Sequence, residues 1–95
     1  MNKTLFHIGI TTPPVIAGDG IKAIEAILNQ ADDWIRYDAH GWIVYGSNNL
    51  DYWRDQLRTI PTLGGNTAFF ICAFSPYQYS GYMTDWVWTW LKKYK

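Results

Sequence analysis

Residues 33–47, Asp-Trp-Ile-Arg-Tyr-Asp-Ala-His-Gly-Trp-Ile-Val-Tyr-Gly-Ser, constrain the fold more than any other stretch of the chain. Aromatic and β-branched residues, which fit a half-buried pleated surface, are concentrated in residues 34–37 and again in 42–45. Residues 38–41 between them have the composition of a turn, and Gly41 can adopt the positive φ angle that a type I turn with a bulge requires. The stretch therefore predicts a β-hairpin, and the other elements can be placed relative to it.

The chain before the hairpin has the pattern of one strand followed by one helix. Apolar side chains on both sides of residues 3–11 predict a central strand, which ends before Pro13 and Pro14 because proline has no N–H to donate. Residues 20–30 carry apolar side chains at helical spacing, and Asp19 is the expected N-cap. Along the strand we expect two sets of side chains on opposite sides, one with Phe6, Ile8 and Ile10 and the other with Leu5, His7 and Gly9.

The chain after the hairpin predicts a helix, a strand and a final helix. Residues 50–60 have an apolar stripe at helical spacing, and Ser47 or Asn48 is the expected cap. Residues 67–74 form a nearly continuous apolar run whose length is typical of a strand. The last helix follows Thr84, its expected N-cap, and is amphipathic.

The resulting order of elements is β-α-β-β-α-β-α. Two interleaved βαβ units with right-handed crossovers give a ferredoxin-like α+β sandwich, in which a four-stranded antiparallel sheet has two helices on one face. Depending on the strand register, the other face holds Trp34 and Arg36 or Ile35 and Tyr37, together with Phe69 and Ile71 or Phe70 and Cys72. Neither choice is polar throughout, so a bare face would be an apolar patch. We therefore expect the last helix or a second subunit to cover it.

Aromatic residues are the compositional anomaly of this 95-residue, one-domain chain. Its six tryptophans and seven tyrosines exceed the needs of so small a core, so several rings are expected to face solvent, a partner or a ligand. They could stack on nucleic-acid bases, anchor a protein interface or cover the chain's own sheet, and a net charge of zero favours the protein interface. The interface candidates are Tyr37, Tyr45, Tyr77, Tyr79, Tyr82, Trp88 and Tyr94.

The charge and the N-terminal sequence limit the partners and the compartment. Eight basic and eight acidic residues do not give the strong positive charge typical of nucleic-acid binders. A single cysteine, an N-terminus without a signal-like apolar run and no stretch long enough to span a bilayer predict a cytoplasmic protein with no membrane partner. A local basic patch would still allow nucleic-acid binding, and its candidates are Arg54, Arg58, Lys92, Lys93 and Lys95.

No residue pattern in the sequence indicates a catalytic centre. Asp38 and His40 form the only acid–histidine pair close in sequence, but an aspartate in a hairpin turn is more often a cap for backbone N–H groups. His7, on a central strand, is more often a half-buried structural histidine. Cys72 lies in an apolar strand that gives it no reason to be a thiolate. We therefore expect no catalytic residue, no metal ligand and no cofactor.

Four features taken together resemble the SinR-like small proteins of bacteria and phages, which are relatives of the CRISPR-associated spacer-acquisition nuclease. They are a short first strand ending near prolines, a hairpin whose strands open with Trp34 and Trp42, the helix after it, and the ending Gly-Tyr-Met-Thr-Asp-Trp-Val-Trp-Thr-Trp-Leu over residues 81–91. The resemblance implies a ferredoxin-like fold and a homodimer. In the nuclease relatives an aspartate at the end of the first strand binds a divalent metal. Residues 9–11 here, Gly-Ile-Thr, hold no carboxylate, which argues against metal-dependent cleavage.

These features predict a non-catalytic protein-interaction module, dimeric and encoded by a phage or a mobile element. One expected role is inhibition of a host defence complex of the CRISPR type. Two alternatives are kept. The first is a metal-dependent endonuclease of the spacer-acquisition type, and the second is a nucleic-acid-binding protein that uses the basic residues.

Overall fold

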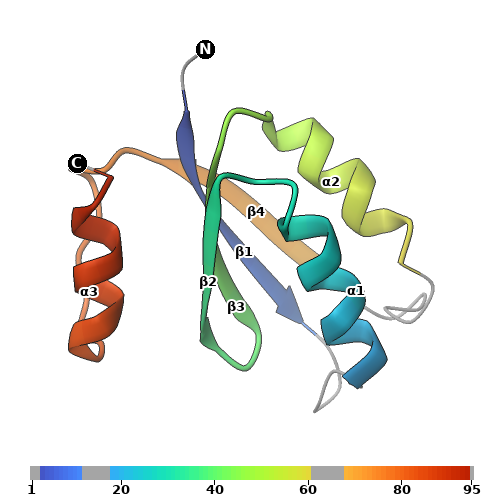
Figure 1. The fold of residues 1–95 in the computed structure, drawn as a ribbon, viewed down its shortest axis with the longest axis horizontal. Coiled ribbons are helices and arrows are strands. Elements are labelled where there is room, and N and C mark those ends of the chain that lie inside the picture. The colour runs from blue at the N-terminus through green and yellow to red at the C-terminus, as the bar shows by residue number, and fades with distance from the viewer. Residues whose placement is uncertain (1–2, 12–17, 61–67, 95) are drawn as a thin grey trace.

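Four strands and three helices follow one another in the order that the sequence predicts (Figure 1). The computed structural model describes residues 3–11, 18–60 and 68–94, and over them the chain is a small α+β fold with an antiparallel sheet. The elements are β1 (Thr4–Thr11), α1 (Gly18–Leu28), β2 (Asp33–Asp38), β3 (Gly41–Gly46), α2 (Leu50–Arg58), β4 (Ala68–Phe74) and α3 (Asp85–Lys92).

The sheet has the strand order β2-β3-β1-β4, so that β1 and β3 lie inside it and β2 and β4 are its edges. All neighbouring strands are antiparallel. In the register, Gly9 of β1 faces Gly41 of β3, and Leu5 of β1 faces Phe74 of β4. The crossovers β1-α1-β2 and β3-α2-β4 each join two strands that have one other strand between them.

Helices lie on both faces of the sheet, with α1 and α2 on one face and α3 on the other (Figure 1). The first core, under α1 and α2, consists of Phe6, Ile8, Ile10, Ile24, Leu28, Trp42, Val44, Trp53, Leu57 and Ile60. The second core, under α3, consists of Leu5, Ile43, Val87, Trp90 and Leu91. The predicted alternation of β1 is confirmed, because Phe6, Ile8 and Ile10 enter one core and Leu5 the other.

The expectation that the last helix covers the second face is confirmed. Ile35 and Tyr37 of β2 lie on this face, together with Cys72 and Phe74 of β4, which settles the register that the sequence left open. The buried side chains of α3 have the spacing i, i+3, i+4 of an amphipathic helix and pack against them. No helix of the described ranges combines the length and the apolar character needed to cross a membrane.

The cap of α2 differs from the two candidates, Ser47 and Asn48. Asn49 is the N-cap, with an extended backbone, and its Oδ1 accepts a hydrogen bond of 2.8 Å from the N–H of Tyr52. A capping side chain must directly precede the first helical residue, since only then does its oxygen reach an N–H group two or three residues further on. The expected cap was therefore placed too early in the chain.

The other two helices also begin with details that the sequence did not reveal. α1 begins at Gly18, so Asp19 lies within the helix rather than before it, and the prediction of Asp19 as N-cap is wrong. Thr84 is the N-cap of α3, as predicted, but its side chain makes no capping hydrogen bond. The short helix α3 therefore depends on packing rather than on a strong cap.

The hairpin forms where it is predicted, but the structural reason for glycine at position 41 differs from the predicted one. The φ angle of Gly41 is not in the positive range that the turn prediction required. Instead, a Cβ atom at this position would lie 2.7 Å from Cζ of Tyr37 and 2.8 Å from its hydroxyl oxygen. The pairing of β2 with β3 shifts between Arg36 and Asp38, so Tyr37 is the extra residue of a bulge. Glycine is required at position 41 because an aromatic ring lies directly over it.

Candidate functional site

The edge strand β4 leaves one side of its backbone without a partner strand. Among the described residues it pairs with β1 alone. The N–H of Ile10 donates to the carbonyl oxygen of His40, a bond of 2.9 Å directed toward β3. Since alternate residues of a strand direct their backbone groups to opposite sides, Leu5, His7 and Gly9 direct theirs toward β4.

This register shows which backbone groups of β4 point away from the sheet. The residues of β4 that face Leu5, His7 and Gly9 direct their N–H and C=O groups inward, to β1. The N–H and C=O groups of the residues between them, Phe69, Ile71 and Ala73, consequently point away from the sheet. These groups are positioned to pair with one more strand.

The side chains of this edge are apolar and partly exposed. The whole strand Ala68–Phe74 contains no charge and no proline. Phe70 is 68% exposed, and Leu50 at the start of α2 is 40% exposed. A groove between α2 and β4 is lined by Leu50, Asp51, Arg54, Phe69, Phe70 and Ile71. A long apolar edge is the kind of strand that pairs with another chain.

The opposite edge, β2, has features that hinder such pairing. Asp33, Arg36 and Asp38 place charges along it, and the bulge at Tyr37 interrupts its ladder. Asp38 also accepts a hydrogen bond of 3.0 Å from the backbone N–H of His40, the capping role expected of an aspartate in a turn. The two edges of one sheet thus differ in charge and in regularity.

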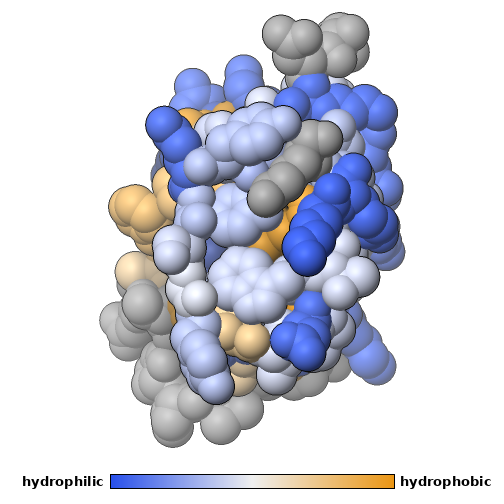
Figure 2. Space-filling view, turned by 90° about the vertical axis from the view of Figure 1, so that its left-hand side faces the viewer, coloured by the Kyte–Doolittle hydropathy of each residue, from blue (hydrophilic) through white to orange (hydrophobic). Residues whose placement is uncertain are grey.

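Five of the seven aromatic interface candidates pack around the second core. Figure 2 shows this side of the molecule, where pale side chains of intermediate hydropathy lie over orange, apolar ones. The ring of Tyr45 stacks on Tyr94 with centroids 4.0 Å apart, and the ring of Tyr79 stacks on Trp88 at 6.0 Å. Part of the aromatic surplus therefore covers the chain's own sheet, and a role in an interface stays a prediction. The five are Tyr37, Tyr45, Tyr79, Trp88 and Tyr94.

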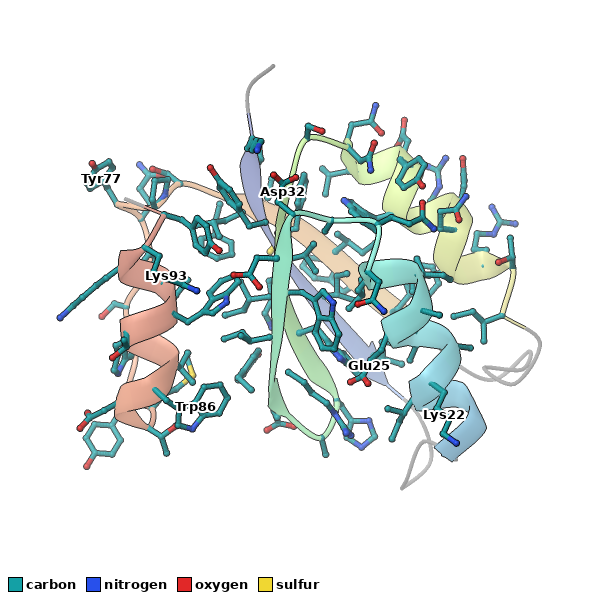
Figure 3. The ribbon with its side chains drawn as sticks, in the orientation of Figure 1. Lys22, Glu25, Asp32, Tyr77, Trp86 and Lys93 are labelled. Carbon is teal, nitrogen blue, oxygen red and sulfur yellow. The ribbon has the colours of Figure 1, made fainter. Side chains whose placement is uncertain are left out.

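The other two candidates, Tyr77 and Tyr82, are exposed. Trp86 is also half exposed, although it falls on the apolar spacing of α3. Tyr77 and Trp86 lie at opposite ends of α3 in Figure 3. The exposed rings beside α3 therefore do not form one patch.

The basic-patch candidates are separated by the sheet. Arg54 and Arg58 belong to α2, whereas Lys92 and Lys93 lie at the C-terminal end of α3, on the opposite face (Figure 1). Lys95 lies outside the described residues. The structure therefore does not bring these side chains together.

Two of these cations also have carboxylate partners. The guanidinium of Arg54 is 3.2 Å from Asp51 and 3.1 Å from Asp55, and Nζ of Lys93 is 3.3 Å from Asp33. These ion pairs reduce the positive charge available to a nucleic-acid backbone.

The second face of the sheet holds few titratable or nucleophilic side chains. Nε2 of His7 shares a hydrogen bond with the hydroxyl of Tyr37, and Cys72 faces His7 in the β1–β4 register. Among the residues that the structure describes, no three side chains of histidine, cysteine, aspartate or glutamate lie close enough to hold one metal ion.

Sequence reasoning did not predict that Leu50 is exposed, and it named Phe70 only as one option for the second face of the sheet. Both are apolar residues of elements that the sequence predicts correctly. The available signal is the absence of charge in residues 67–74, but a buried central strand has the same pattern. Only the strand order shows that this run forms an edge.

Among the described residues, the edge of β4 is the exposed apolar strand edge of the sheet. Comparisons of the chain with protein-family models, with curated proteins and with solved structures found no match, so a functional assignment rests on the residues and geometry of this chain.

Proposed function

We propose that the chain is a non-catalytic protein-interaction module, with a ferredoxin-like fold, that binds its partner by adding a strand to the edge of β4. The fold assignment is supported by the strand order, in which each βαβ crossover passes over one intervening strand. The function is supported above all by one observation. The edge of β4 is regular and uncharged and, within the described residues, has no further strand beside it, whereas the edge of β2 is charged and bulged.

A second copy of the chain is the partner that this edge fits best. Antiparallel pairing about a two-fold axis at Ile71 places Phe69 opposite Ala73 of the other copy, and Phe70 opposite Cys72. Each phenylalanine then faces a smaller side chain, and like charges do not meet because the strand has none. All the outward N–H and C=O groups of one strand also meet those of the other, as a self-complementary interface requires.

The energy of such a dimer depends on apolar burial as well as on backbone pairing. A backbone hydrogen bond contributes only about 0.5–1.5 kcal/mol net, and full burial of a phenylalanine side chain contributes about 1.5–3 kcal/mol. Association itself costs at least several kcal/mol of lost freedom. We therefore expect a dimer that dissociates on dilution through roughly the micromolar range.

The first test compares Phe70→Lys with a matched control, Tyr82→Lys, by sedimentation equilibrium. Both side chains are exposed, so neither change disturbs a core. A lysine at position 70 places like charges near the two-fold axis, and we expect the dimer dissociation constant to rise at least about tenfold. Tyr82→Lys is expected to leave it unchanged. A wild-type chain that stays monomeric at millimolar concentration contradicts the proposal, as does an equal effect of the two variants.

The second test changes the backbone rather than a side chain. Ala73→Pro removes an N–H that points outward and leaves the ladder to β1 intact, so the monomer is expected to fold and the dimer to weaken. Circular dichroism checks the fold and sedimentation checks the association. A folded Ala73→Pro variant that associates like the wild type shows that β4 is not the interface.

Inhibition of a host defence complex stays a prediction of the sequence. It is checked by mixing the purified chain with CRISPR effector complexes of its host. If the chain binds none of them, the predicted role as an inhibitor is wrong. Cleavage of labelled RNA or DNA that requires Mg²⁺ or Mn²⁺ and disappears with EDTA indicates the endonuclease alternative instead. A gel shift that weakens steeply with salt indicates the nucleic-acid binder.

A further inference from the structure

One flank of α2 borders the groove beside the edge of β4 and is exposed to solvent. This flank consists of Leu50, Asp51 and Arg54, and all three side chains are exposed. The residues of β4 that line the groove with it include Ile71, on which the proposed two-fold axis lies. Because this groove separates the flank from the outer strand, the α2 flank faces the position that the second copy takes.

The proposed strand pairing places the α2 helices of the two copies on the same side of the joined sheet. Opposite residues of two paired strands have their side chains on one face, so the first faces of both copies are continuous. The two-fold axis makes the two helices antiparallel, and every contact between them occurs twice. Helices pack with their axes about 8–10 Å apart, which is about two strand spacings, so helices set back from two paired edges can meet.

The α2 flank carries two opposite charges that suit such a reciprocal contact. Within one copy, Nη1 of Arg54 is 3.2 Å from Asp51 and its Nε is 3.1 Å from Asp55. Among the described residues, Nη2 of Arg54 makes no further hydrogen bond. Because a guanidinium has five N–H donors, Arg54 can bind a second carboxylate while it keeps the first. The two-fold axis offers Asp51 of the second copy for this role.

The strand alone leaves more than one register open. β4 contains no charge, and moving the axis from Ile71 to Cys72 still pairs outward backbone groups with outward ones. This move displaces the second copy along the strand by two residues, or about 7 Å. An ion pair requires nitrogen and oxygen atoms within about 4 Å, so charges that meet in one register are separated in the other. The α2 flank can therefore select one register.

We propose that the α2 flank is the second contact surface of the dimer and fixes its register through two reciprocal ion pairs between Asp51 and Arg54. This inference rests on the proposed function, because it takes the pairing at β4 as its starting point. The partner is a second copy of the chain, since an unrelated strand at this edge brings no helix with the complementary charges. Burial of Leu50, which is exposed in the single chain, adds apolar area to that of the strands.

The test uses two charge reversals, Asp51→Arg and Arg54→Asp, first separately and then mixed. In each variant alone the reciprocal contacts join like charges, so the dimer dissociation constant is expected to rise about three- to tenfold. In an equimolar mixture opposite charges meet at both contacts, and the mixed dimer is expected to be as tight as the wild type. Fluorescence-detected sedimentation of one labelled variant with the other unlabelled measures this. A substitution that only disturbs its own helix is not rescued by mixing.

Arg58→Asp is the matched control, because Arg58 is exposed on the same helix but does not line the groove. It is expected to change the dissociation constant by less than about twofold. If the mixed dimer is no tighter than either variant alone while Phe70→Lys still weakens the wild-type dimer, the α2 contact is wrong and the pairing at β4 stands. A wild-type chain that stays monomeric at millimolar concentration overturns both.

Discussion

The two faces of the sheet are packed in different ways. The first core is built from aliphatic side chains, one phenylalanine and two tryptophans, and most of it has no exposed surface at all. The second core has only five buried side chains, and half-buried, mostly aromatic residues surround it. A cavity of about 200 Å³ beneath α3 and the His7–Tyr37 pair also belong to the second face. The comparison indicates that α1 and α2 supply most of the stability and that α3 covers a face which retains space and polar groups.

The helices themselves explain part of this difference. α3 has eight residues, and a helix shorter than about 12 residues is marginal by itself in water. Its N-cap Thr84 makes no side-chain hydrogen bond, whereas Asn49 caps α2. We therefore infer that α3 detaches from the sheet at a lower free energy than α1 and α2 do.

The largest expected effect comes from emptying the first core. Trp53→Ala removes a ring with no exposed surface and is expected to lower the free energy of unfolding by about 3–5 kcal/mol. Trp90 in the second core is 8% exposed, so Trp90→Ala is expected to cost about 3 kcal/mol. Urea denaturation measures both, and Trp86→Ala, at a half-exposed position, is the control and is expected to cost under about 1 kcal/mol. A Trp90 variant that loses more stability than the Trp53 variant reverses the comparison.

The order of the elements could be predicted because hydrophobic period and turn composition are local properties. The hairpin of residues 33–47 and the apolar run before Phe74 both form as expected. The caps are less predictable, since Ser47, Asn48 and Asn49 are chemically similar and only the position of the first helical residue distinguishes them.

An intermediate loss of stability is expected from a substitution at Gly41 in the hairpin, on the second face of the sheet. Gly41→Ala places a Cβ atom within 2.7 Å of the Tyr37 ring and is expected to cost about 1–3 kcal/mol. Adding Tyr37→Ala removes the obstacle, so the double variant is expected to be more stable than the sum of the single changes implies. A double-mutant cycle in urea measures this coupling. Strict additivity shows that the ring does not lie over Gly41.

The candidate binding region could be predicted less well, because it depends on long-range pairing. Nothing local distinguishes the exposed Phe70 from a buried strand residue until the strand order is known. The pair of His7 and Tyr37 is separated by 30 positions, so no sequence motif reveals it. The aromatic surplus predicts an interface with a partner, which stays a prediction, and it did not reveal that five of the seven candidate rings pack around the second core.

The smallest expected effect concerns the attachment of the end of α3 to β2. The hydroxyl of Tyr94 donates to Oδ2 of Asp33, and Nζ of Lys93 is 3.3 Å from the same oxygen. Burial raises the pKa of the Asp33 carboxyl, but the hydrogen bonds from Tyr94 and Lys93 outweigh it, and the net pKa is lowered. Burial, followed by the hydrogen bond to Asp33, raises the pKa of Tyr94 to about 12.

These shifts predict a loss of stability at both ends of the pH range. Because the folded pKa of Asp33 lies below its unfolded value, its contribution is present above about pH 4 and is lost as the pH falls through the folded pKa. Because the folded pKa of Tyr94 lies above its unfolded value, its contribution is present below about pH 10 and is lost as the pH rises toward 12. Both groups are partly exposed, so solvent screening keeps each effect below about 1 kcal/mol. Melting temperatures of Asp33→Asn and Tyr94→Phe against pH should therefore be flatter than wild type at the acid and the alkaline end respectively. If the slope of melting temperature against pH is unchanged in both variants, this end of α3 is not held to β2. In that case α3 covers the second face even less firmly than the comparison of the two faces implies.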